Sequence, residues 1–317
     1  MVLLVLYACS QKKEEITITL GGDIMLARSG EAIFKNGNGT VINPWSELED
    51  KGIIKHGSNY NADYFFANLE SPLGQNSSSS GEMNLCSDPA EVSLLLEGNL
   101  SLVSLANNHR DDCQVGGDQV TQEILLENGI LSVRGDFEPV YFDTPQGRLA
   151  VLAAEDVSSP VDIDDLTDRI TKARTGTDFV IVSMHWGNEY QAGPDENQEN
   201  LAQRIADAGA DVIWGHHPHV LQRMEWLRSS TGRDVLVLFS LGNLLSDQWM
   251  LEDAQRSALV KLTFEDMKIN QIEIYPVRMN RSEKRLQSVT DQKTRDQIID
   301  RLQVEELIKE NVVVIVR

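Results

Sequence analysis

Short apolar runs separated by amphipathic stretches are the feature of this sequence that most restricts its fold. Residues 16–20 alternate apolar and polar side chains, as a half-buried strand does. Further β-branched runs cover residues 62–68, 100–106, 149–154, 179–184, 211–214 and 235–241. Helical spacing lies between several of them, as in Leu201, Ile205 and Ala208, with Gly209 as a C-cap. Strands that alternate with helices indicate βα units, so we predict a layered α/β fold.

The pattern changes near the end of the 317-residue chain. Residues 259–264 and 269–277 predict a hairpin of two strands, and 281–311 is charged and helix-like. Residues 312–316 are apolar enough for a last strand. The sequence therefore predicts three parts: a lipoprotein-like signal segment and tether at 1–15, one domain at 16–280, and a C-terminal extension at 281–317.

The N-terminus is similar to a bacterial lipoprotein signal. An apolar run ends in Leu6-Tyr7-Ala8-Cys9 and is followed by the polar stretch SQKKEE. Acylation of Cys9 would anchor the protein to a membrane on its extracytoplasmic side. The alternatives are a frayed apolar N-terminus of a cytosolic protein and a truncated gene start. No later segment is long and apolar enough to predict a membrane span.

The two remaining cysteines, Cys86 and Cys113, form an even pair if Cys9 is lipidated. An exported protein with one such pair is expected to form a single disulfide. Two unrelated buried thiols are the alternative.

The formal charge of −21 restricts the partners of this chain. An acidic surface repels phosphate backbones, and the sequence has no basic patch with interleaved aromatic residues. We therefore expect no nucleic acid partner.

Polar residues gather at the ends of the predicted strands. They are Asp23, Glu70, Asn107-Asn108-His109, His185, His216-His217-Pro218-His219 and Ser240-Leu241-Gly242-Asn243. Five of the six histidines lie in three of these clusters, and His56 is expected to be a loop histidine. Because ligands bind at the carboxyl ends of strands in α/β sheets, we expect one shared polar site. Imidazole, carboxylate and amide ligands predict one or two divalent ions such as Zn, Mn or Fe.

The motifs GGDIM, NLES, LANNH, HWGNEY, GHHPH and SLGN occur in this order. Together, these motifs and their order resemble those of the CapA family of poly-γ-glutamate capsule synthesis. The resemblance covers most of the chain. The resemblance implies a fold similar to the calcineurin-like metallophosphoesterases, which is a two-sheet sandwich flanked by helices.

The resemblance also implies roles for single residues. The metal ligands that it implies are Asp23, Glu70, Asn108, His185, His217 and His219, with His216 competing with His217. His109 corresponds to the catalytic histidine. Glu189, which follows His185 in HWGNEY, is a candidate to orient a ligand or act as a base, or else a solvated loop carboxylate.

Two positions depart from the phosphoesterase pattern. Met25 stands where those enzymes carry a histidine ligand, and Arg110 stands where they usually carry an acidic residue. Methionine cannot replace imidazole for a hard ion, so one metal site is weakened or is left to Glu70 and water.

Three functions remain open on the sequence. The first is a metal-dependent hydrolase acting outside the membrane on an amide or a phosphoester. The second is a non-catalytic accessory subunit that binds an anionic polymer such as poly-γ-glutamate, beside membrane synthase subunits. The third is an intracellular phosphatase, which requires Cys9 to be unlipidated.

Overall fold

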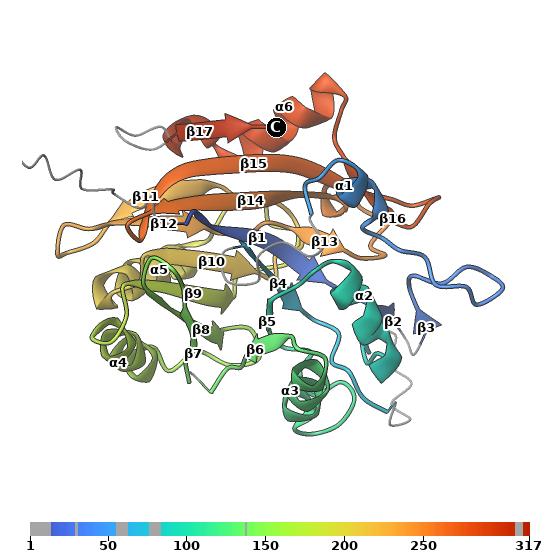
Figure 1. Cartoon of the computed structure of the whole chain (residues 1–317), viewed down its shortest axis with the longest axis horizontal. Coiled ribbons are helices and arrows are strands. Elements are labelled where there is room, and N and C mark those ends of the chain that lie inside the picture. Colours follow the sequence, from blue (N-terminus) through green and yellow to red (C-terminus); the bar gives the residue numbers. More distant parts are fainter. Residues whose placement is uncertain (1–13, 29–30, 55–62, 76–83, 137, 308–312) are drawn as a thin grey trace, which may run out of the picture.

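Two β-sheets packed face to face form the centre of the molecule in the computed structural model (Figure 1). The structure describes residues 14–28, 31–54, 63–75, 84–136, 138–307 and 313–317. The predicted lipidation site Cys9 and the loop histidine His56 lie outside these residues. Among the described helices, none has the length and apolar character needed to cross a membrane.

The first sheet combines strands from the early part of the sequence with strands from its late part. Its strands lie in the order β16-β15-β14-β1-β4-β5-β6, with β13 paired to β1 and β17 paired to β15. β1, β4, β5 and β6 are parallel, whereas β14, β15 and β16 are antiparallel. The bounds are β1 Ile16–Ile24, β4 Asp63–Leu69, β5 Leu102–Ser104, β6 Leu131–Val133, β13 Asn243–Leu245, β14 Arg256–Glu265, β15 Lys268–Asn280, β16 Arg285–Ser288 and β17 Val313–Val316.

The second sheet is formed by the middle of the chain, in the order β11-β12-β10-β9-β8-β7. The neighbours β8, β9, β10 and β12 are parallel. The bounds are β7 Val140–Asp143, β8 Arg148–Glu155, β9 Phe179–His185, β10 Val212–His216, β11 Met224–Arg228 and β12 Asp234–Leu238. A separate pair of short strands is formed by β2 Ala27–Arg28 and β3 Glu31–Ala32.

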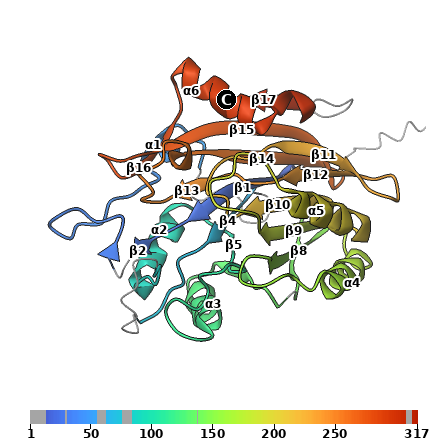
Figure 2. The ribbon, with the colours of Figure 1, turned by 180° about the vertical axis from the view of Figure 1, so that it is seen from behind.

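Helices cover the outer face of each sheet, as both views of the ribbon show (Figures 1 and 2). The first sheet packs against α1 Ser46–Asp50, α2 Val92–Glu97 and α3 Gly117–Glu127. The second packs against α4 Ile163–Arg174 and α5 Glu196–Ala208. α6 Gln292–Leu302 packs on β14 and β15. Three 3-10 turns complete the described elements: η1 Pro89–Glu91, η2 Asp253–Gln255 and η3 Val304–Leu307.

Strict alternation of side chains along β8 explains the layers. Leu149, Val151 and Ala153 face the core between the two sheets. Ala150 and Leu152, with the same backbone conformation, face α4 and α5 instead. A strand buried on both faces needs apolar residues at every position, which is the pattern of a central parallel strand. The predicted two-sheet sandwich flanked by helices is therefore confirmed.

The C-terminal part differs from its predicted helix at 281–311. β15 turns at Asn280, whose side-chain oxygen accepts from the backbone N–H groups of Ser282 and Glu283, and β16 then pairs back onto β15. Within the described residues of this stretch, the α-helix is α6, whose N-cap is Asp291. The predicted last strand is present as β17, and the division at residues 280 and 281 stays a prediction.

Candidate metal centre

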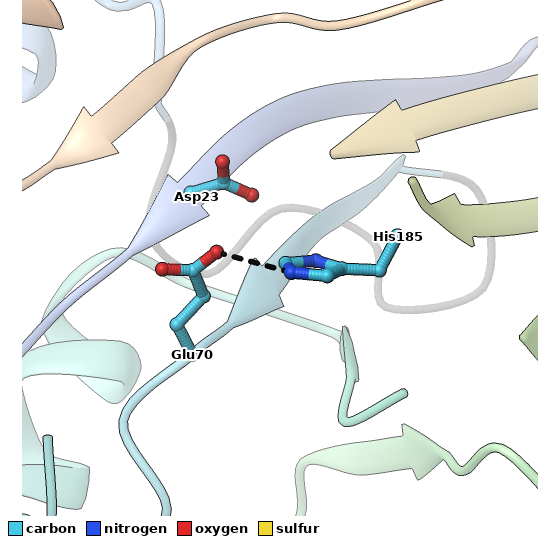
Figure 3. A group of neighbouring side chains, drawn as sticks. All are labelled: Asp23, Glu70 and His185. Carbon is cyan, nitrogen blue, oxygen red and sulfur yellow. Dashed lines mark ion pairs between the residues drawn. The ribbon is translucent and has the colours of Figure 1, made fainter. Parts of the chain in front are cut away.

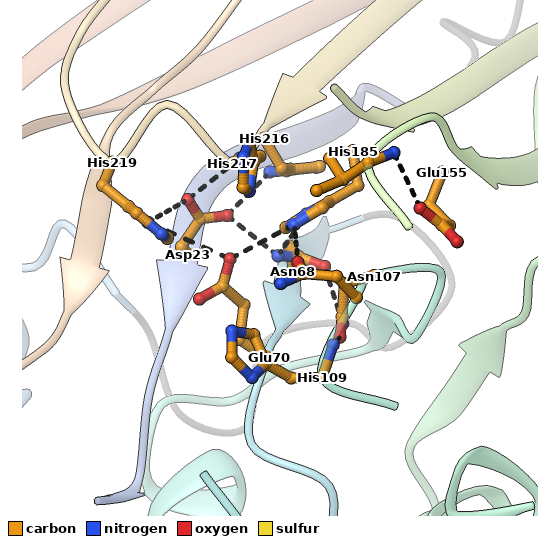
Figure 4. A network of polar contacts seen from close by, with 12 residues as sticks. Asp23, Asn68, Glu70, Asn107, His109, Glu155, His185, His216, His217 and His219 are labelled. Atoms are coloured by element: carbon orange, nitrogen blue, oxygen red, sulfur yellow. Dashed lines mark hydrogen bonds and ion pairs between the residues drawn. The ribbon is translucent and has the colours of Figure 1, made fainter. Parts of the chain in front are cut away.

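The site lies where the parallel strands of both sheets end. β1 and β4 belong to the first sheet, and β9 and β10 belong to the second. The indole Nε1 of Trp214 on β10 donates to the carbonyl oxygen of Gly21 on β1 at 2.9 Å and so joins the two sheets. The residues that follow these strands consequently meet at one place (Figure 4).

Gly22 allows the chain to approach itself closely beside the site. A Cβ at this position would lie 1.9 Å from the carbonyl oxygen of Gly242, which only glycine avoids. The Asp23 N–H donates to the same carbonyl oxygen at 2.9 Å. Asp23 is thereby aligned between Asn68 on β4 and Asn243 on β13.

Asp23, Glu70 and His185 form a buried group that could hold a metal ion. One potential ligand atom from each lies within 4.8 Å of the others. The Glu70 Oε1 is 3.6 Å from the His185 Nε2, and all three side chains are buried (Figure 3). Two carboxylates and an imidazole are suited to a divalent ion of the Zn, Mn or Fe type.

Unpartnered polar atoms in this cluster test whether a cation fits. Within the described part of the chain, neither Glu70 oxygen has a hydrogen-bond partner, nor does either ring nitrogen of His216 or the Nδ1 of His217. A buried carboxylate without a partner is costly, whereas coordination to a cation satisfies it. The side chains present therefore fit a divalent metal ion.

Asp23 lies among polar side chains from two strand ends, those of β4 and β10. It accepts from the Asn68 amide at 2.8 Å, and its oxygens are 3.4 Å from the His216 Nδ1 and 3.3 Å from the His219 Nδ1. Burial by itself would raise the pKa of Asp23, but the two histidines hold that pKa well below its usual range. Glu70 is farther from its histidine neighbours, at 3.6 Å from the His185 Nε2 and 3.9 Å from the His219 Nδ1, and burial raises its pKa to about 7.

Asn108 joins the cluster through His185. Its side-chain oxygen is 2.8 Å from the His185 Nε2, and the Asn68 amide nitrogen is 3.4 Å from the His185 Nδ1. Burial, followed by the neighbouring His217, lowers the pKa of His185 well below its usual value. A neutral imidazole is the form that binds a metal ion.

His217 and His219 have left-handed backbone conformations, with φ of 92° and 57°. Such conformations are strained for residues other than glycine and concentrate at functional sites. Burial lowers the pKa of His217 to about 4. The pKa of His219 is about 9, because Glu70 and Asp23 outweigh the effect of burial. The His216 Nδ1 is 3.4 Å from an Asp23 oxygen, and the His217 ring centroid is 4.9 Å from that of His185, so both His216 and His217 remain candidate ligands.

His109 and Glu189, the two predicted catalytic residues, lie at the border of the cluster. The ring of His109 lies beside Glu70 in Figure 4, and its Nδ1 is 2.9 Å from the Asp112 Oδ2. Burial lowers the pKa of His109, but Asp112 and Glu70 raise it more, so the net shift is upward. Glu189 is exposed and acts on Glu70, His217 and His219 through its charge.

A disulfide between Cys86 and Cys113 holds the loop that carries His109. The Cα atoms are 4.8 Å apart, which confirms the predicted pairing. Next to it, Asp112 accepts from the Leu85 N–H at 2.7 Å, and the Asp112 carbonyl accepts from Asn84. The disulfide and these bonds fix Asp112 where it contacts His109.

Three polar residues of the site are not assigned a role by the sequence. Asn68 falls within a predicted apolar run, although an amide inside FFANLE is a signal of a buried polar contact. Asn243 is predicted only as a strand end, and it is 3.1 Å from the His219 Nδ1. Asp112 has no such signal, because only the folded loop brings it to His109.

The two-sheet sandwich flanked by helices, with a polar cluster at its strand ends, has a metallophosphoesterase-like fold. Residues 17–248 match the family described as bacterial capsule synthesis protein PGA_cap, and the chain belongs to this family. The predicted CapA relationship is thereby confirmed.

Relatives with curated names agree with this family. The chain is 29% identical to capsule biosynthesis protein CapA of Bacillus anthracis, over 84% of this chain and 68% of that protein. It is 27% identical to PGA biosynthesis protein CapA of Bacillus subtilis, over 81% and 70%. It is 22% identical to a probable polyglutamine synthesis accessory protein of Mycobacterium tuberculosis, over 73% and 74%.

A solved structure shares the fold. It is a hypothetical protein from Thermus thermophilus, with a TM-score of 0.51 and 15% identity. The match covers 82% of this chain and 98% of that one.

Proposed function

We propose that this protein acts in the synthesis or export of poly-γ-glutamate, an anionic capsule polymer, outside the cytoplasm. Membership of the capsule synthesis family supports a role in polymer synthesis, as do the names of the two Bacillus relatives. Anchoring through Cys9, beside membrane synthase subunits, is part of the proposal and is motivated by the sequence around that cysteine.

The cluster is proposed to hold at least one divalent ion, of the Zn, Mn or Fe type. The proposed ligands are Asp23, Glu70, Asn108, His185, His217 and His219, with His216 as the competitor of His217. One observation carries this proposal most directly: Glu70 is fully buried and both of its oxygens lack hydrogen-bond partners among the described residues.

The arrangement around this cluster is suited to hydrolysis of an amide or a phosphoester. A divalent ion bound there would polarise a substrate carbonyl or phosphoryl oxygen. His109, fixed through Nδ1 by Asp112, has its other ring nitrogen available to hold a proton for the leaving group. Glu189 is exposed and so is placed to orient substrate or to remove a proton.

A non-catalytic accessory role is the second candidate, and Met25 favours it. Met25 is buried in the core on the outer face of the first sheet, and its sulfur accepts from the Arg28 guanidinium at 3.4 Å. The position that supplies an imidazole ligand in phosphoesterases therefore supplies none here. The Mycobacterium tuberculosis relative is named as a probable accessory protein.

Two histidine variants distinguish a metal ligand from a catalytic residue. His217→Ala should lower both metal content and activity, because it removes a coordinating imidazole. His109→Ala should keep its metal and lose about 10²–10⁴-fold in rate, as expected for loss of a general acid. Metal analysis of both purified variants, beside turnover of γ-glutamyl amides and phosphoesters, makes the comparison.

Equal metal loss in both variants would make His109 a ligand. If the parent protein binds metal but turns over no substrate of either class, the accessory role replaces the hydrolase. Full metal in His217→Ala would assign the ligand to His216 instead.

A further inference from the structure

A cavity of about 610 Å³ lies between α6 and the loops beside the candidate metal centre. Three arginines line it, each from a different part of the chain: Arg223, Arg256 and Arg301. Asp253 and Asp300 line it as well. A volume of this size is typical of a ligand pocket. In a chain with a net charge of −21, a cavity with more arginines than acidic residues is a local exception.

The cavity shares two chain segments with the metal centre. Leu221 lines the cavity and follows His219 by two residues. The loop of Ala192, Gly193 and Pro194 also lines it and follows Tyr190, whose ring centroid is 6.1 Å from that of His219.

Hydrogen bonds join these two segments. Tyr190 N–H donates to the Pro218 carbonyl at 2.8 Å, and the Gln222 amide donates to the Gln191 carbonyl at 2.9 Å. The cavity and the cluster are therefore bordered by the same two hydrogen-bonded segments.

Arg301 is the arginine best placed to bind a ligand. Arg223 is held by Glu199 at 2.6 Å and stacks on the Phe239 ring. Arg256 contacts Glu252 and is 2.8 Å from Asp253.

The contacts of Arg301 are longer than these. They are 3.4 Å to the Asp253 carboxylate and 3.5 Å to the Leu221 carbonyl, near the limit of hydrogen bonding. A guanidinium has five N–H donors, so Arg301 retains capacity for a carboxylate.

We propose that this cavity binds a segment of a chain in which amide groups alternate with free carboxylates, with a carboxylate on Arg301 and amide N–H groups on Asp253 or Asp300. The assignment rests on the proposed function, since a γ-linked glutamate chain has this chemistry. The mixed lining argues for it: a simple polyanion meets repulsion from the two aspartates, whereas an amide-bearing chain offers them donors. The cavity thereby becomes a subsite that guides polymer toward the metal centre.

Titration of the full protein with a γ-linked glutamate oligomer, followed by calorimetry, tests this subsite. Arg301→Gln should weaken binding about 10-fold or more, as expected for loss of a charge-assisted hydrogen bond. Arg301→Lys should recover part of the affinity because it restores the charge. Gln297→Glu adds a carboxylate at an exposed position of the cavity wall and should also weaken binding.

Arg228→Gln is the matched control, because Arg228 is a surface arginine paired with Asp234 at 2.9 Å and is not among the residues that line the cavity. It should leave the affinity unchanged. Polyacrylate, which has carboxylates without amides, should bind more weakly than the γ-linked oligomer.

Failure of this inference is distinguishable from failure of the metal proposal. Unchanged oligomer affinity in Arg301→Gln and Gln297→Glu, or no binding by the parent protein, would overturn the subsite whatever the metal content. An equal loss of oligomer affinity in Arg228→Gln would also overturn the subsite, because the effect would then be one of overall charge. Loss confined to the cavity variants, with their metal content equal to that of the parent, is the expected result.

Discussion

Asn68 couples two of the proposed metal ligands. Its amide nitrogen donates to Asp23 at 2.8 Å and lies 3.4 Å from the His185 Nδ1. Residues behind the ligands fix the orientation and protonation of those ligands, so their loss lowers metal affinity. Asp23, Glu70 and His185 could be predicted because each follows an apolar run at a strand end. Asn68 could not, because an amide within an apolar run shows its role only when the neighbouring strand is in register with Asp23.

Asn68→Ala is expected to lower metal affinity about 10–100-fold. It should also lower the free energy of unfolding of the metal-free protein by about 1–3 kcal/mol, because a buried carboxylate loses its donor. Metal titration and urea unfolding measure the two effects.

Asn197→Ala is the matched control, since Asn197 donates to Asp156 at 2.6 Å on the surface. This substitution should lower the free energy of unfolding by no more than about 0.5 kcal/mol. Equal effects of the two substitutions would show that Asn68 has no special role at the centre.

At the scale of elements, the loop after β5 depends on covalent and polar links rather than on regular structure. Cys113 is bonded to Cys86, and Asp112 contacts both Leu85 and His109. The hairpin of β14 and β15 and the amphipathic α5 were predictable because apolar periodicity specifies them locally. The prediction of a helix for the charged stretch 281–311 is wrong where β16 forms. A turn that begins at Asn280 outweighs the helical composition of this stretch.

Replacing both Cys86 and Cys113 with serine is expected to lower the free energy of unfolding by about 2–4 kcal/mol, mainly because the unfolded chain gains freedom. Urea unfolding with and without dithiothreitol measures the change. Reduced parent protein should match the double variant, and the double variant should not respond to reductant. An unchanged midpoint for the parent under reducing conditions would contradict a stabilising disulfide.

At the scale of the whole molecule, the site exists only because distant segments pair. β1 pairs with β14, with Ile16 opposite Phe264, and β10 from the second sheet contacts β1 through Trp214. Local periodicity predicts strands but not the sheet that each one joins, so the sandwich was inferred from the family resemblance and not from spacing. The fully buried group of Asp23, Glu70 and His185 is the product of this long-range pairing, and it carries the proposed function.

Metal content per chain, measured by elemental analysis after exposure to Zn, Mn and Fe and removal of free ions, tests this claim most directly. The parent protein should retain at least one divalent ion per chain. Glu70→Gln should retain much less, because the buried carboxylate that lacks hydrogen-bond partners among the described residues is gone. Glu189→Gln, which changes an exposed carboxylate at the border, should match the parent. A folded parent protein that retains none of these ions, or a Glu70→Gln variant that retains as much as the parent, would contradict a metal centre at these strand ends.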